Sequence, residues 1–83
     1  MYYVYVLRSI SHREKFYIGN TDDLKQRFTA HNAGESLHTK RYVPWELVYY
    51  EAYISRKLAR NREAKLKHHG KGFSELKKRI LEG

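Results

Sequence analysis

The hydrophobic pattern near the N-terminus predicts two strands. The segment YYVYVLR (2–8) is rich in Tyr and Val, and KFYIG (15–19) is a second aromatic run. These residue types favour extended backbone, and the polar stretch between the two segments is typical of a turn. We therefore expect residues 2–8 and 15–19 to pair as a hairpin, with Gly19 ending the second strand.

The pattern then becomes helical. Thr21 or Asp22 is expected to cap a helix, with acidic residues in the first turn, where the helix dipole favours negative charge. Three of the side chains that follow recur at helical spacing and fall on one stripe: Leu24, Phe28 and His31. We expect this helix to end at NAG (32–34), with Gly34 as its C-cap.

A long run of Trp, Val and Tyr predicts the third strand. Residues 35–43 form a polar, basic segment that we expect to be a loop, and Pro44 separates it from WELVYYEAY (45–53). Because bulky apolar and aromatic side chains dominate this last segment, we expect it to be the most buried strand of the sheet.

Two helices are expected after the third strand. Ser55 can cap a helix over about residues 56–68, HHGKG (68–72) interrupts it, and residues 73–83 predict a short third helix. The element order β-β-α-β-α-α predicts an α+β fold, with a small three-stranded sheet flanked by helices. At 83 residues the chain has room for one domain, which we expect to span residues 1–83.

Composition excludes several classes of protein. The chain has no cysteine, which excludes disulfides, thiolate zinc sites and a cysteine nucleophile. No apolar run approaches the roughly 20 residues needed to cross a bilayer, and MYYVYVL resembles neither a signal peptide nor an anchor. We therefore expect a folded, cytoplasmic protein that has no membrane partner.

The net charge of +8 is concentrated towards the C-terminus. Residues 54–83 hold 10 Lys and Arg against 3 Asp and Glu, and so carry +7 of the total. Clustered cations bind nucleic acids by displacing condensed counterions, so this concentration indicates a nucleic acid partner. The alternative is a solvated helix face that only aids solubility.

Residue types suited to phosphodiester chemistry are expected on one face. Arg27 and His31 are neighbours on the first helix, and the strand that ends at Gly19 brings Tyr17 close to them, with Tyr5 in the paired strand. Arginine offers forked donors that match phosphoryl oxygens. Tyrosine, with an ordinary pKa of about 10, is a poor base unless positive charge lowers that pKa. A hard divalent cation would also stabilise the leaving oxygen.

The second predicted helix carries one isolated acid. Glu63 is the only Asp or Glu between residues 52 and 74, and it lies beside Ala59 and Leu66 on the expected inward stripe. Its carboxylate is a candidate ligand for a metal ion. The alternative is a helix ion pair, worth only about 0.2–0.5 kcal/mol, with one of three basic residues: Arg56, Arg60 or Lys67.

At these residues the sequence resembles the GIY-YIG nuclease superfamily, and more narrowly its small stand-alone bacterial members of the UPF0213 type, related to the nuclease domain of UvrC. YVY (3–5) matches the first motif loosely, and YIG (17–19) matches the second in full. The later segments DLKQRFTAHNAG, TKRYVPWELVYYE and REAKLK are similar to the later blocks of that subgroup. The resemblance covers essentially the whole chain.

The resemblance implies a role for each candidate residue. Tyr5 and Tyr17 match the two motif tyrosines, one of which activates water in relatives. Arg27 matches the arginine that steadies the phosphate, and His31 matches a position held by His or Tyr. Glu63 matches the single ligand of one divalent cation, Mg²⁺ or Mn²⁺.

Each role has a structural alternative. Tyr5 and Tyr17 could pack the hairpin, Arg27 could pair with Asp23 one turn earlier, and His31 could be hydrogen-bonded at the edge of the core. For the two tyrosines, which of them is the base stays open.

The sequence also departs from the family pattern. Tyr3 stands where the first motif has glycine, and Asn20 stands where UvrC-like members have a lysine. No asparagine follows Glu63 to match the late asparagine of some relatives, and we expect His38 to be a surface residue. The chain shows no separate target-reading domain, so we expect little sequence specificity.

Two functions follow from these observations. The first is a metal-dependent endonuclease or nicking enzyme on duplex or branched DNA, structure-directed and repair-related. The second is a non-catalytic nucleic-acid-binding module that retains the fold and the basic helices; RNA, an acidic protein partner and the oligomeric state stay open. In either case, seven basic residues are expected to contact the nucleic acid: Lys40, Arg41, Arg56, Arg62, Lys65, Lys67 and Lys71.

Overall fold

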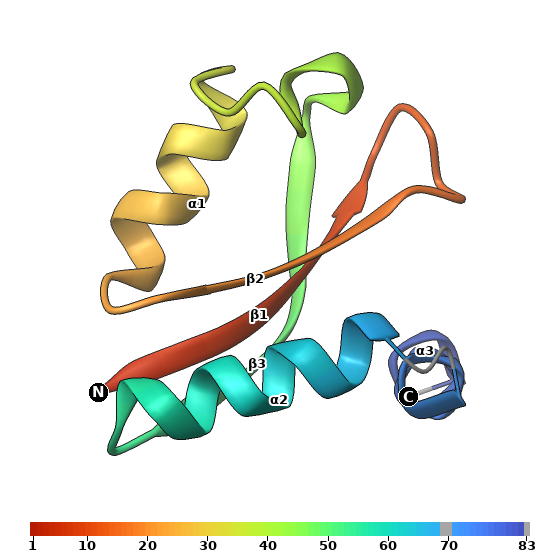
Figure 1. The fold of residues 1–83 in the computed structure, drawn as a ribbon. Helices are drawn as coiled ribbons and strands as arrows, with labels where there is room; N and C mark the ends of the chain where they lie inside the picture. The colour runs from red at the N-terminus through yellow and green to blue at the C-terminus, as the bar shows by residue number, and fades with distance from the viewer. Residues whose placement is uncertain (69–70, 83) are drawn as a thin grey trace.

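The computed structural model describes residues 1–68 and 71–82. They form a three-stranded sheet with helices on both faces (Figure 1). The strands are β1 (Tyr2–Ser9), β2 (Phe16–Thr21) and β3 (Trp45–Tyr53). The helices are α1 (Leu24–Asn32), α2 (Arg56–His68) and α3 (Lys71–Glu82), with a short 3-10 helix η1 (Lys40–Tyr42) before β3. The predicted α+β fold and its element order are confirmed.

β1 is the central strand of the sheet. The strand order is β2-β1-β3, and β1 pairs antiparallel with both neighbours. Four consecutive side chains of β1 are buried, whereas Trp45 is the only buried residue of β3. The expectation that β3 would be the most buried strand is therefore wrong: it lies at the edge of the sheet, and its aromatic residues are mostly half-exposed.

The two faces of β1 supply two separate clusters. Val4 and Val6 pack with residues of α2 and α3, whereas Tyr5 and Leu7 pack with residues of α1 and with Trp45. This division follows from the alternation of side chains along a strand. Figure 1 shows the result, with α1 on one side of the sheet and α2 on the other. The candidate residues on α1 and β1 consequently share one face.

The start of α1 differs from the prediction by one or two residues. The N-cap is Asp23, whose Oδ1 accepts the backbone N–H of Gln26 at 3.0 Å. Thr21 cannot cap the helix, because its Oγ1 accepts the N–H of Asp23 at 3.1 Å and so shapes the turn before it. At the other end, Gly34 adopts a φ of +76°, the left-handed conformation expected where a helix stops.

Gly19 does not end β2, which continues to Thr21. It lies opposite Tyr5 in the sheet. A Cβ at position 19 would lie 2.5 Å from the Tyr5 hydroxyl oxygen and 2.6 Å from Cζ. The glycine therefore makes room for the Tyr5 ring.

The two C-terminal helices agree with the sequence pattern. Ser55 caps α2, with its Oγ accepting the N–H of Leu58 at 3.2 Å. The predicted interruption falls partly on residues 69–70, which lie outside the described residues, and α3 begins at Lys71, two residues earlier than expected. Within the described part of the chain, no helix is long and apolar enough to span a bilayer.

Candidate functional site

Tyr5, His31 and Thr39 form a buried chain of hydrogen bonds. Tyr5 and His31 are each 1% exposed, and Thr39 is fully buried. The Tyr5 hydroxyl lies 2.8 Å from Nε2 of His31, and Nδ1 of the same ring lies 2.7 Å from Oγ1 of Thr39. Both ring nitrogens are thus occupied, which fixes the orientation of the imidazole.

Electrostatics keep this chain uncharged. Burial raises the pKa of Tyr5 to about 12, an effect that the nearby Arg27 guanidinium partly opposes and that Tyr17 and Glu63 reinforce. Burial also lowers the pKa of His31, and the positive charge of Arg27 lowers it further. A neutral imidazole has one N–H and one bare nitrogen, so His31 can accept a hydrogen bond at one ring nitrogen while donating one from the other.

The four sequence-predicted residues of this face lie together. Arg27 is exposed on α1, and its guanidinium interacts with the Tyr5 hydroxyl. Tyr17 is half-buried on β2, with its ring centroid 4.9 Å from that of His31 and 6.3 Å from that of Tyr5. The alternative in which the Arg27 side chain pairs with Asp23 is not formed. The contact between the two residues is a backbone one, in which the N–H of Arg27 donates to the carbonyl oxygen of Asp23 at 3.0 Å, as part of the helix start.

Glu63, on α2, lies at the outer edge of β2. Its Oε2 lies 2.6 Å from Nζ of Lys67, and its Oε1 accepts a hydrogen bond from the Asn20 amide. Nζ of Lys67 in turn lies 5.8 Å from the centroid of the Tyr17 ring. The carboxylate therefore faces the outer edge of β2 next to Tyr17.

Glu63 fits a site for one hard divalent cation. The Glu63 side chain is 17% exposed, so its carboxylate is accessible to solvent, and Asn20 and Lys67 hold it in position. Mg²⁺ typically keeps several waters and binds through one or two carboxylates together with phosphate oxygens of the substrate. No cluster of three or more metal-binding side chains occurs among residues 1–68 and 71–82.

Two residues of the site were missed by sequence reasoning. Asn20 was noted only as a departure from the family pattern, yet it holds Glu63. Thr39 lies in the loop before η1; it opens the segment TKRYVPWELVYYE, but it was not among the candidate site residues. Its sequence separation from His31 gives no signal that they meet, because the contact depends on the path of the loop.

The basic residues occupy different environments. Arg62 forms a two-pronged ion pair with Glu51, with distances of 2.9 and 3.1 Å, and the hydroxyls of Tyr49 and Tyr53 donate to the same carboxylate. Arg62 is thereby engaged within the fold. Arg56 lies over the Tyr2 ring at 4.9 Å.

Four of the other predicted contact residues are exposed: Lys40 and Arg41 on η1, and Lys65 and Lys67 on α2. The side chain of Lys71 lies outside the described part of the structure. His38 is exposed, as expected.

Buried neutral His31 predicts a loss of stability in mild acid. Its folded-state pKa is lowered, so on acidification the unfolded chain, with a histidine pKa of about 6.5, binds this proton first. The stabilisation is complete above about pH 6.5 and is lost as pH falls towards the lower folded-state pKa. Thermal unfolding should show a decrease in Tm from about pH 7 to about pH 5, and a smaller decrease for His31→Gln. Equal decreases would assign the effect to other groups.

Comparisons with known proteins identify the family of the chain. The family model described as the GIY-YIG catalytic domain matches residues 1–78. UPF0213 proteins of Streptococcus pyogenes serotypes M3 and M1 are 41% identical over 66 residues, which cover 78% of this chain and 70% of each relative. The solution NMR structure of a UPF0213 protein from Bacillus halodurans superposes with a TM-score of 0.55 at 28% identity, covering 93% of this chain and 84% of that chain.

In its superfamily, the GIY-YIG domain implies nuclease-type activity on a nucleic acid, generally dependent on a divalent metal. The predicted resemblance is confirmed by the extent of the family match, by the sequence relatives and by the shared fold. The chain belongs to the GIY-YIG family, as a small member similar to the UPF0213 proteins.

Proposed function

We propose that this protein is a metal-dependent endonuclease that nicks DNA. The observation that carries the proposal is the meeting of two phenols, a guanidinium and a carboxylate beside β2, although they come from four separate elements, β1, β2, α1 and α2. A repair-related role on branched DNA and a cytoplasmic location belong to the same proposal.

Hydrolysis joins a water oxygen to phosphorus and breaks the bond from phosphorus to the leaving oxygen, which receives a proton. We assign the activation of water to Tyr17, because its ring is half-buried and reaches solvent. Tyr5 is 1% exposed and hydrogen-bonded to His31, so we assign it a positioning role beneath Tyr17 and His31 and not the activation of water. As the base, Tyr17 would accept the proton of water at its phenolic oxygen; Nζ of Lys67 lies 5.8 Å from the centroid of its ring.

Arg27 and Glu63 act on the phosphate. The exposed guanidinium of Arg27 would donate to the non-bridging oxygens, where negative charge builds up in the transition state. Glu63 would hold Mg²⁺ or Mn²⁺, and such an ion supplies charge neutralisation for the leaving oxygen.

Cleavage of a substrate panel tests this function. Purified protein is incubated with supercoiled, duplex, flap, junction and single-stranded DNA and with RNA, in Mg²⁺, in Mn²⁺ and in EDTA. We expect nicking that requires the metal, and Glu63→Gln purified in parallel controls for a contaminating nuclease. Cleavage that is equal with and without metal, or equal in the two proteins, contradicts the proposal.

A binding module without hydrolysis is the second candidate, and the pairing of Glu63 favours it. Lys67 and Asn20 already satisfy both carboxylate oxygens, an arrangement that is stable without an ion. A binder would lose affinity linearly in log salt and would not respond to Mg²⁺. A titration followed by NMR separates the two candidates, since a nuclease should shift the signals around Glu63 at millimolar Mg²⁺.

A further inference from the structure

A notch opens at the outer edge of β2, between that strand and the helices α2 and α3. Its volume is about 330 Å³, at the small end of the range for ligand pockets. We call it the β2-edge notch. Six residues line it: Phe16, Tyr17, Ile18, Leu66, Lys67 and Phe73.

The β2-edge notch combines aromatic rings with cations. The rings of Phe16 and Phe73 meet edge to face, with centroids 5.6 Å apart. Lys67 is the cation among the lining residues. Two further cations border the notch over the Phe16 ring: Nζ of Lys77 lies 5.0 Å and the guanidinium carbon of Arg8 5.3 Å from its centroid. None of the lining residues is acidic. Proteins that hold unpaired nucleic acid strands use this combination, with rings for the bases and cations for the phosphates.

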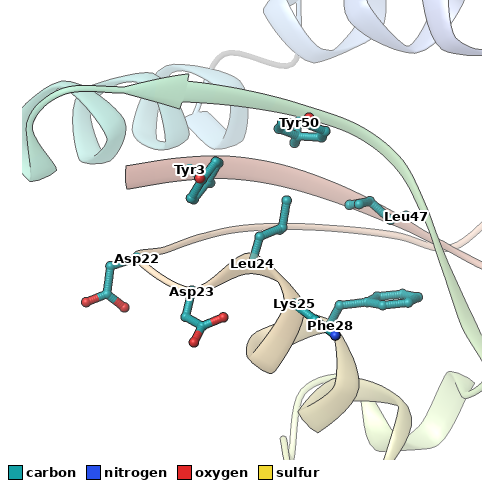
Figure 2. Close-up of a pocket in the computed structure, with 8 residues that line it drawn as sticks. All are labelled: Tyr3, Asp22, Asp23, Leu24, Lys25, Phe28, Leu47 and Tyr50. Atoms are coloured by element: carbon teal, nitrogen blue, oxygen red, sulfur yellow. The ribbon is translucent and has the colours of Figure 1, made fainter. Parts of the chain in front are cut away.

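A larger hollow on the other face of the sheet lacks that complementarity. It has a volume of about 470 Å³ and lies between α1 and the strands β1 and β3. Figure 2 shows Tyr3 and Tyr50 on its sheet side, with Asp22 and Asp23 near the start of α1. Lys25 is the single cation among its lining residues, so the two carboxylates would repel a phosphate strand. Aromatic lining alone does not distinguish the two hollows, but charge does.

Tyr17 joins the β2-edge notch to the candidate nuclease residues. Its ring lines the notch and lies 4.9 Å from the ring of His31, and Lys67 lines the notch while pairing with Glu63 at 2.6 Å. A group bound in the notch therefore lies next to the position proposed for the scissile phosphate. In a duplex, the faces of each base are covered by its neighbours, so only an unpaired or extruded base can stack on these rings.

We propose that the β2-edge notch binds one unpaired nucleobase beside the scissile bond, with Lys77 and Arg8 contacting the adjoining phosphates. The inference rests on the proposed function and names its substrate class: nucleic acid with at least one unpaired nucleotide at the cleavage site. Flaps and single strands satisfy this requirement, and a continuous duplex does not.

Binding of a single-stranded 12-mer and of a blunt duplex tests the notch without hydrolysis. Affinity is measured by fluorescence anisotropy in EDTA for the wild type, for Phe16→Leu, which keeps an apolar side chain but removes the ring, and for Tyr50→Leu, the matched aromatic change in the acidic hollow. Because stacking on an aromatic ring contributes about 1–3 kcal/mol per base, Phe16→Leu should weaken single-strand binding about tenfold. Its duplex affinity, and both affinities of Tyr50→Leu, should stay within about twofold of wild type.

A second readout and a second variant keep the test decisive. A 2-aminopurine moved along the 12-mer should lose fluorescence at one position in the wild type and recover it in Phe16→Leu. If Phe16→Leu lowers the Tm strongly, Lys77→Gln replaces it, and the salt slope for the single strand should fall by about one. Equal losses on both probes, or a selective loss in Tyr50→Leu, would overturn the notch assignment. Stacking without any metal-dependent cleavage would instead contradict the nuclease proposal and support the assignment of the notch as a base-binding site.

Discussion

Replacing Gly19 by alanine is expected to lower both the stability and the activity of the protein. The new Cβ would lie 2.5 Å from the hydroxyl oxygen of Tyr5 and 3.0 Å from Cε2 of Tyr17. Tyr5 cannot move away easily, because its ring is buried and its hydroxyl is bonded to His31. Overpacking of this kind costs about 1–3 kcal/mol, and a displacement of about 1 Å at a catalytic group can reduce the rate about 10²-fold.

Gly72→Ala is the matched control for this substitution. Its Cβ would meet Lys65 O at 3.8 Å and Leu66 Cδ2 at 4.0 Å, which are ordinary contacts, in a helix that favours alanine. Thermal unfolding should show a lower Tm for Gly19→Ala, by at least about 4 °C, and no decrease for Gly72→Ala. Wild-type stability and nicking in Gly19→Ala would show that Tyr5 has room to adjust and that its position is not critical.

Nicking is expected to fall about 10²–10³-fold in Arg27→Ala, the range observed when one donor to a developing negative charge is removed. The guanidinium lies at the surface of α1 beside Tyr5, so its loss leaves the core packing intact. Glu63→Gln should reduce the metal-dependent rate to background, because it removes the carboxylate proposed to hold the ion while its amide oxygen can still accept from Asn20.

The two variants are compared with Lys40→Ala, an exposed cation outside the proposed catalytic cluster. Initial nicking rates are measured at saturating DNA, with circular dichroism and Tm to verify the fold. Lys40→Ala should weaken DNA binding and reduce the salt dependence of the affinity, with a smaller effect on the nicking rate. A retained rate in Arg27→Ala or Glu63→Gln, with the fold intact, would remove that residue from the mechanism.

Local patterns predicted most of the fold. Strand-forming residues, the helical stripe and the caps around α2 each reflect interactions between residues close in sequence, so β1, β2, α1 and α2 were located to within a few residues. The burial of β3 was misjudged because strand order is a property of the whole sheet. A run of Trp, Val and Tyr is compatible with a central strand and also with an edge strand that uses tyrosine hydroxyls at the surface.

The site was predictable only where a motif marks it. Residues 17, 27, 31 and 63 have recognisable spacings. The structure brings Tyr17 against His31 and Arg27 against Tyr5, and it connects Glu63 to the Tyr17 ring through Lys67. The function of Gly19 as space for a facing ring required the register of β1 and β2. Thr39 required the path of a loop, which no periodicity encodes.

The pairing of Glu63 with Lys67 bears on whether the protein needs a divalent ion in order to fold. In many small metalloproteins the site does not form until the ion binds, so the empty chain is unfolded. Here the acid already has an internal counter-ion one helical turn away. An ion bound by Glu63, as we propose, would therefore replace the Lys67 ammonium at a surface that is already folded.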